Sequence, residues 1–296
     1  MKSRLLYFLG WLIVSGSSLF SYQYELAVCA IFQDEAPYLK EWIEFHRMMG
    51  VQRFWLYNNN STDNYQEVLE PYIKKRIVKL IDWPSPLDAD WTPYQNAAYA
   101  DCMTRSLGKA KWVAVIDIDE FIVPVDHEKQ ILSTLRKIEK TKPRVGGLML
   151  FWQFFGTSHL HDIPPGKTFV ETMLLKAPKD YTGNRHVKTI CRPEYVENCY
   201  VHVCTYKPGF RDMALNGNCG PYQPIQTEPI RIHHYFTRTE RYLYEKKIPR
   251  RQRYEGKAFD CESIARLVSQ WDEELNQEFD NTILKYVPKL RKRLGY

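Results

Sequence analysis

The sequence predicts an α/β fold with a Rossmann-like, mostly parallel sheet flanked by helices. Four strand-like segments alternate with three helical patterns within the first 123 residues, an alternation typical of a parallel sheet with right-handed crossovers. The last of these strands, residues 112–116, is apolar throughout, which predicts a strand buried on both faces. It ends abruptly at Asp117, Asp119 and Glu120. Ligands bind outside the carboxyl ends of the strands in such sheets, so we expect these acids to line a site.

Local signals justify each of these elements. The strands are the apolar segments at residues 26–32, 54–57, 77–81 and 112–116, and the helical patterns between them lie at residues 37–49, 66–73 and 92–108. Pro37 suits the first turn of a helix, and Gly50 suits its C-terminal cap. Thr92, Pro93 and Gln95 combine an N-cap, a first-turn proline and a capping-box glutamine. No dinucleotide fingerprint or P-loop sequence is present.

The second half of the chain is less regular. Asp126 is expected to cap a helix that runs to about residue 140, and residues 147–155 predict a strand. Residues 156–229 are rich in Pro, Gly, Asn and His, so we expect an irregular half that covers the sheet edge and shapes a second site. Further short strands and helices are expected at residues 187–191, 200–206, 231–235, 239–253 and 262–294.

The N-terminal segment has the features of a signal peptide or a short membrane anchor. Lys2 and Arg4 precede an apolar stretch that ends in small residues and is shorter than the roughly 20 residues of a comfortable membrane span. We therefore expect three parts: this segment at residues 1–22, a main domain at 23–260 and a C-terminal helical extension at 261–296. The protein would then be associated with a membrane or exported.

Composition narrows the partners and the redox chemistry. The 296 residues carry a net charge of +6, which favours an anionic partner such as a phosphate-bearing ligand or a membrane surface. The basic runs are not interleaved with aromatic residues, so we expect no nucleic acid partner. The seven cysteines include no C-x-x-C pair, which argues against a structural zinc site. Cysteines at four nearby positions can pair if the domain is exported, namely Cys191, Cys199, Cys204 and Cys219.

The acidic cluster after residue 116 predicts a divalent metal site. Mg²⁺ or Mn²⁺ is typically held by one or two carboxylates plus substrate phosphates and water. We expect Asp119 to bind the metal directly and Asp117 to reach the metal or a ribose. Glu120 is equally suited to a structural role, because adjacent residues on a strand point to opposite faces. The alternative is that the D-x-D acids cap the next helix or face water.

Five motifs, in order, resemble glycosyltransferase family 92 and its bacterial relatives. They are FQDEAPYLKEWIEFHRMMGVQRFWLYNNNSTDN, QNAAYADC, WVAVIDIDEFIVP, HVKTICRPEYV and HHYFTRTE. The resemblance covers the chain from about Glu25 to Lys247. It implies a GT-A fold, a nucleotide-diphosphate sugar as donor and a divalent metal, usually Mn²⁺. It also implies a hexosyltransferase similar to inverting galactosyltransferases, acting on a glycan of a glycoprotein, glycolipid or lipopolysaccharide.

The resemblance assigns further residues to the donor site. Lys188 and His202 match the later family motif and are expected to meet diphosphate oxygens, although either residue also suits a solvated strand position. His234 matches a distal metal ligand, with His233 as the alternative if the strand faces the other way. Gln95 and Asp101 match the family's Q-x-x-x-x-x-D-C pattern, although Gln95 also suits a capping box.

Two more acids are expected at the nucleoside. Glu35 and Asp63 follow the first and second strands and would face the same crevice, although both also suit helix caps. Relatives often carry Asn-Glu where this chain has Gln33-Asp34-Glu35, a departure that bears on the nucleoside contact.

An inverting transfer also needs a carboxylate that takes the proton of the acceptor hydroxyl. Asp162, Glu171 and Asp180 lie in the half expected to line the acceptor site, and the sequence does not choose among them.

Two rival functions share the D-x-D pattern or the fold. A metal-dependent phosphohydrolase of the haloacid dehalogenase kind also places D-x-D after an apolar strand, but carries Thr or Val where this chain has Phe121. An inactive, membrane-tethered carbohydrate-binding module would keep the fold and lose the chemistry.

Overall fold

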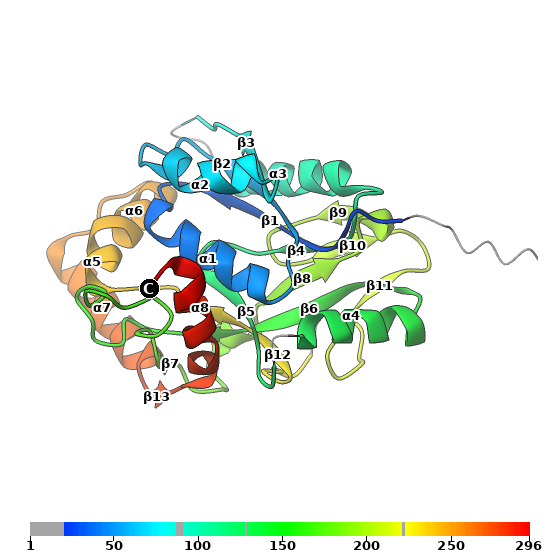
Figure 1. Ribbon diagram of the computed structural model, residues 1–296. Helices are drawn as coiled ribbons and strands as arrows, with labels where there is room; N and C mark the ends of the chain where they lie inside the picture. The colour runs from blue at the N-terminus through cyan, green and yellow to red at the C-terminus, as the bar shows by residue number, and fades with distance from the viewer. Residues whose placement is uncertain (1–20, 87–90, 128, 221–222) are drawn as a thin grey trace, which may run out of the picture.

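One nine-stranded sheet organises the part of the chain that the computed structural model describes, residues 21–86, 91–127, 129–220 and 223–296. Its strands are β1 (Tyr24–Phe32), β2 (Arg53–Asn58), β3 (Val78–Asp82), β4 (Ala110–Val115), β5 (Glu120–Pro124), β6 (Val145–Phe154), β8 (Val187–Cys191), β11 (Arg211–Ala214) and β12 (Ile230–His234). Figure 1 shows helices on both sides of this sheet. The expected signal peptide or anchor lies almost wholly outside the described residues.

Eight α-helices accompany the sheet within these described ranges: α1 (Ala36–Met48), α2 (Tyr65–Lys74), α3 (Trp91–Ser106), α4 (Gln130–Thr141), α5 (Glu240–Tyr242), α6 (Ile248–Glu255), α7 (Cys261–Leu275) and α8 (Val287–Leu294). Two small antiparallel pairs lie apart from the sheet, β9 (Val196–Cys199) with β10 (Cys204–Tyr206), and β7 (Leu175–Lys176) with β13 (Glu278–Phe279). No helix in this part of the chain is long and apolar enough to cross a membrane.

The predicted parallel half of the sheet is confirmed. The strand order is β3-β2-β1-β4-β8-β6-β12-β5, and the first four strands of that order pair in parallel. Successive residues of β1 face opposite sides. Val28 belongs to the core cluster that includes buried residues of α1, α2 and α4, and Cys29 belongs to the cluster that includes buried residues of α3. Both faces are therefore covered by helices, as a buried parallel sheet requires.

The second half differs from the prediction. Strand β8 pairs antiparallel with both β4 and β6, so it lies inside the sheet and does not cover its edge. The strand expected at 200–206 is a hairpin, because Tyr200 N donates to Val203 O (2.9 Å) and only 204–206 continue as a strand. The helix expected after Asp126 begins at Gln130. The side chain of Gln130 accepts from Asp126 N through Oε1 and donates to the Asp126 carboxylate through Nε2. Residues 120–124 form strand β5, which was not predicted from the sequence.

The strand directions bring distant segments to one edge. Strands β6 and β12 run parallel to each other and in the same direction as β4, because β8 is antiparallel to both of its neighbours. Strand β5 is antiparallel to β12, so its first residue lies where β12 ends. The ends of β1, β4, β6 and β12 and the starts of β5 and β8 therefore share the edge at which ligands are expected.

Helix α1 is fastened to this edge by two buried side chains. Its predicted inner face is confirmed, since Leu39, Trp42, Ile43 and His46 are all buried. Trp42 Nε1 donates to Glu120 O (2.8 Å), and His46 Nε2 lies 3.2 Å from Ile122 N while its Nδ1 lies 2.9 Å from Trp42 O. An Nδ1–H tautomer satisfies both contacts, so His46 is a neutral structural histidine.

We expect His46 to make the fold sensitive to acid. Burial lowers the pKa of His46 to about 3, so this residue's stabilising contribution is complete above the unfolded pKa of about 6.5 and is lost as the pH falls toward 3. At pH 5 the loss reaches about 2 kcal/mol. Urea unfolding at pH 7.5 and pH 5 gives the change in the free energy of unfolding between the two pH values. This change should be smaller by about this amount in His46→Gln than in the parent. Equal differences in parent and variant would contradict the assignment.

The C-terminal helices pack on the body of the domain. Figure 1 shows α8 against α1, and Arg293 pairs with Glu44 there at 2.7 Å. Trp271 of α7 packs edge-on against Phe236, just beyond β12. All seven cysteines are free thiols. Cys199 and Cys204 lie directly opposite each other on β9 and β10, with their sulfur atoms 3.1 Å apart.

Candidate active site

Asp117 lies just beyond β4 and accepts three side-chain hydrogen bonds. Tyr99 OH (3.0 Å) and Gln95 Nε2 (3.2 Å) donate to Oδ1, and Lys188 Nζ (2.7 Å) donates to Oδ2. Tyr99 and Gln95 come from α3, and Lys188 comes from the start of β8. The structure therefore joins three predicted site residues, Gln95, Asp117 and Lys188, in one hydrogen-bonded group.

Lys188 is a buried cation between two acids. Its ammonium lies 2.7 Å from Asp117 and 3.5 Å from Glu120. Burial acts to lower the pKa of Lys188, but the two carboxylates outweigh it and raise this pKa. Glu120 is fully buried, burial raises its pKa, and its Oε2 accepts from Asp117 N (2.9 Å). Glu120 thus has the contacts of a structural residue. The sequence alone had left its role open between structural and functional.

Asp119 meets His234 from the far end of the chain. Their Oδ2 and Nε2 atoms lie 3.7 Å apart, and both side chains are largely buried. Tyr235 N donates to Asp119 O (2.9 Å) and so fixes β12 beside the acidic turn. Burial acts to raise the pKa of Asp119, but His234 and then Lys247 outweigh it and hold this pKa below its ordinary value. Burial lowers the pKa of His234, so the pair is carboxylate and neutral imidazole.

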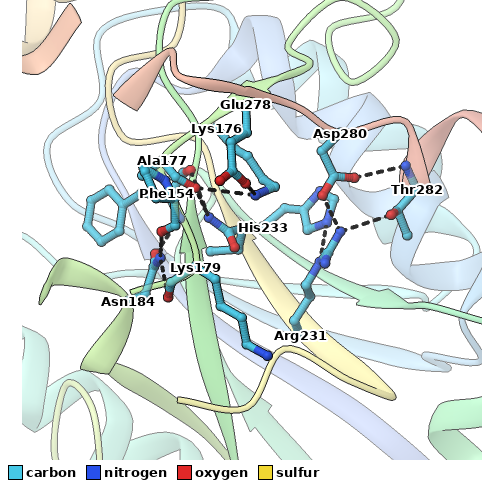
Figure 2. Close-up of polar contacts among 12 residues, drawn as sticks. Phe154, Lys176, Ala177, Lys179, Asn184, Arg231, His233, Glu278, Asp280 and Thr282 are labelled. Atoms are coloured by element: carbon cyan, nitrogen blue, oxygen red, sulfur yellow. Dashed lines mark hydrogen bonds and ion pairs between the residues drawn. The ribbon is translucent and has the colours of Figure 1, made fainter. Parts of the chain in front are cut away.

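His233 faces away from this pair. Figure 2 shows its ring beside Arg231, which also reaches Asp280 and Thr282. Arg231 Nε donates to His233 Nε2 (3.0 Å), and Arg231 Nη2 donates to Asp280 (2.6 Å). Because neighbouring residues on a strand alternate in direction, this contact places His234 toward Asp119 and makes His233 the structural member of the two.

Asp119 and His234 suit a divalent cation. A carboxylate and a neutral imidazole are the forms that bind metals, and two ligands each about 2.1 Å from one ion can be up to about 4.2 Å apart. His234 Nδ1 has no hydrogen-bond partner among the described residues, although it is buried. No group of three or more His, Cys, Asp or Glu side chains in the described ranges is arranged to hold a metal. Two protein ligands are what Mg²⁺ and Mn²⁺ sites use when phosphate and water complete the shell.

A cavity of about 430 Å³ opens beside Gln95, the residue that donates to Asp117. It is lined by Trp91, Thr92, Gln95, Asn96, Tyr200, Val201, His202 and Val203. His202 sits at the β9–β10 turn, where its Nδ1 lies 3.1 Å from Val187 O. Burial and then the nearby Lys188 lower the pKa of His202 to about 4, so the ring is neutral at pH 7. Two residues predicted to contact the donor, Gln95 and His202, therefore face one cavity.

The acids expected at the nucleoside have protein partners. Glu35 is buried and pairs with Arg238 (2.6 Å) and Arg250 (3.2 Å). Asp63 Oδ2 accepts from Ala36 N (2.7 Å), so Asp63 caps α1 and not α2, the helix that follows Asp63 in the chain. The other carboxylate oxygen of Asp63, Oδ1, is buried without a hydrogen-bond partner in the described part of the chain. The nucleoside contacts of both acids stay a prediction.

Asp101 lies on the outer part of α3. Its carboxylate accepts from Tyr57 OH (2.7 Å) and pairs with Arg105 one turn along the helix. Among the described residues it makes no hydrogen bond or ion pair with the D-x-D acids, and its partners are those of a residue that fastens α3 to β2.

The candidate general bases are spread over the second half. Asp162 pairs with Arg241 (2.7 Å) beside α5. Glu171 is mostly buried and pairs with Arg291 of α8 (2.9 Å). Asp180 is exposed just after β7. None of the ion pairs of these three acids reaches Asp119 or His234 in the described ranges, so the choice of base stays open.

Two cationic residues of the site were not assigned from the sequence. Arg238 is buried between the rings of Tyr38 (3.9 Å) and Tyr242 (4.3 Å) and has a left-handed φ of 52°. Lys247 Nζ lies 4.0 Å from Asp119 Oδ2. Both sit in the segment after β12, more than a hundred residues from the acids that they contact, and only the fold brings them there.

Comparison with known proteins decides the family. Residues 23–278 match the family description "Glycosyltransferase family 92". The chain belongs to glycosyltransferase family 92. Family 92 proteins of Oryza sativa subsp. japonica and Arabidopsis thaliana are 35% and 30% identical to it over 182 and 204 residues, which is 61% and 65% of this chain and 29% and 33% of theirs. This family 92 chain thus spans about a third of the length of those relatives.

The solved structures that resemble the chain are more distantly similar. TarS 1–349 of S. aureus has a TM-score of 0.40 at 11% identity, covering 86% of this chain and 67% of TarS. Glucosyl-3-phosphoglycerate synthase of Mycobacterium tuberculosis has a TM-score of 0.30 at 12% identity, covering 44% of each chain. The family 92 chain itself has the predicted GT-A architecture, with its parallel half, inserted antiparallel strands and acids beyond β4.

Proposed function

We propose that this family 92 protein is a metal-dependent hexosyltransferase that uses a nucleotide-diphosphate sugar and extends a glycan. Membership of the family supports glycosyl transfer. The observation that supports metal dependence is the meeting of Asp119 and His234 at 3.7 Å, from the turn after β4 and from the end of β12, in the protonation forms that metals require.

Asp119 and His234 would hold Mn²⁺ or Mg²⁺. When bound, such an ion neutralises charge on the departing diphosphate as a Lewis acid. Tyr99 and Lys188 orient the carboxylate of Asp117, which also accepts from Gln95. Gln95 and His202 line the cavity. This arrangement suits a ligand that extends from the metal into the cavity.

The finer features of the reaction rest on the family resemblance. Transfer of galactose with inversion at the anomeric carbon, to a glycan of a glycoprotein, glycolipid or lipopolysaccharide, is our expectation for the chemistry. Inversion needs one carboxylate near the acceptor hydroxyl, and Asp162, Glu171 and Asp180 stay the candidates. Association with a membrane, or export, would follow from residues 1–22.

Turnover by the full chain tests the proposal. The protein is incubated with nucleotide-diphosphate sugars, galactose donors first, and a mixture of glycan acceptors with Mn²⁺. We expect the nucleoside diphosphate to be released, EDTA to stop the release and added Mn²⁺ to restore it. Anomeric NMR of the product reports inversion or retention. Rapid hydrolysis of an aryl phosphate without sugar transfer would instead indicate a phosphohydrolase, and sugar binding without turnover an inactive module.

A further inference from the structure

The segment after β12 carries a rare π-helical turn at Leu243–Lys247, between α5 and α6. Such turns are often found at functional sites. Its last residue, Lys247, points back to the acidic turn, with Nζ 4.0 Å from Asp119 Oδ2. The neighbouring Lys246 is exposed. The two adjacent lysines therefore have different surroundings, and only Lys247 reaches the site.

Lys247 differs from the other cations of the site. Lys188, Arg238 and Arg250 each lie within 3.2 Å of a carboxylate oxygen. The nearest carboxylate to Lys247 is 4.0 Å away, and its Nζ makes no hydrogen bond to any described residue. An ammonium group has three N–H donors.

The position of this ammonium is set by packing. Its Nζ lies 3.7 Å from the centre of the Phe236 ring, a cation–π contact that holds the charge without using its donors. Arg250, three residues further on, bonds Gln33 O and Glu35 and so anchors α6 beside the end of β1. Figure 1 shows α6 next to the start of α1. Lys247 is thus a half-buried cation on a fixed element, with unused donors beside the Asp119–His234 pair.

We propose that Lys247 binds the diphosphate of the donor, on the side of the Asp119–His234 pair that faces α6. This inference rests on the proposed function, because it requires a nucleotide-diphosphate ligand. Negative charge builds up on the diphosphate oxygens as the bond to the sugar breaks, and a fixed ammonium in a site largely shielded from water stabilises that charge. Phosphate oxygens also satisfy the donors that the protein leaves unused.

Calorimetric titration of the full chain tests the inference. UDP, GDP, ADP and CDP are titrated into the parent with Mn²⁺, and each one that binds is compared with its monophosphate. The same titrations are made on Lys247→Met, which keeps the length of the side chain, and on Lys246→Met as the matched control. Mn²⁺ alone is titrated into all three proteins.

The proposed contact predicts opposite effects on two ligands. Lys247→Met should weaken binding of the diphosphate by about 10- to 100-fold, in the range of a charge-assisted hydrogen bond, and the monophosphate by less. It should bind Mn²⁺ alone at least as tightly as the parent, because a cation next to Asp119 has been removed. Lys246→Met should match the parent in every titration.

Other outcomes overturn the inference in distinguishable ways. Equal diphosphate affinity in Lys247→Met and parent would exclude the contact while leaving the proposed function intact. Weakening of Mn²⁺ and diphosphate together would show that Lys247 only supports the fold of the site. Absence of binding of all four diphosphates by the parent would overturn the proposed function and this inference with it.

Discussion

Asp119→Asn is expected to lower the rate of sugar transfer by about a thousandfold or more. The substitution keeps the shape of the side chain and removes the anionic ligand, and metal stabilisation of the leaving group is worth several kcal/mol, with each 1.4 kcal/mol a factor of ten. The carboxylate of Asp119 lies 3.7 Å from the neutral imidazole of His234 and 4.0 Å from the ammonium of Lys247. Because Asp119 is the anionic member of the proposed ligand pair, the loss of its charge should lower the affinity for the metal.

The fold should survive this change. The backbone bond from Tyr235 N to Asp119 O does not involve the side chain, so β12 stays in place. Circular dichroism and urea unfolding of the variant should match those of the parent, while the isosteric control Asp212→Asn on β11 should keep both fold and turnover. Full turnover by Asp119→Asn would remove the metal assignment.

Lys188→Met is expected to destabilise the protein by about 3 kcal/mol or more. The Lys188 side chain is 1% exposed, and its ammonium balances Asp117 and the fully buried Glu120. Removal of one partner from a buried ion pair leaves an uncompensated charge. Glu120 would take up a proton to limit the cost, since burial already raises its pKa. Urea unfolding at pH 7 gives the change in free energy.

A double variant separates charge from packing. If the loss comes from the unpaired acid, Lys188→Met with Glu120→Gln should be more stable than Lys188→Met alone, because no buried carboxylate is then left without its cation. A loss below about 1 kcal/mol in the single variant, or no recovery in the double variant, would show that the pair is not what stabilises this edge of the sheet.

Much of the first half of the fold was predictable because its signals are local. The apolar run of β4 needs burial on both faces, and the cap signals around α1 lie within a few residues of its ends. The second half of the fold was not predictable in this way. Strand β8 is short, and its place between β4 and β6 depends on pairing with segments more than thirty residues away. Nothing local in residues 187–191 distinguishes an inner strand from a covering one.

The candidate site shows the same division. The two D-x-D acids stand out by their place after a buried strand. His234 was assigned by resemblance, and it lies 3.7 Å from Asp119. Arg238 and Lys247 gave no comparable signal. The position of Arg238 depends on a left-handed backbone and two tyrosine rings, and that of Lys247 depends on a π-helical turn. These features form only when the segment after β12 packs on α1 and the acidic turn.

The most direct test of the central claim is calorimetric titration of nucleoside diphosphates into the full chain and into Asp119→Asn, each with and without Mn²⁺. We expect one nucleotide to bind the parent tightly, only when Mn²⁺ is present, and to lose that dependence in the variant. Binding that is equally tight without Mn²⁺, or unchanged in Asp119→Asn, would contradict a metal-dependent donor site at Asp119 and His234.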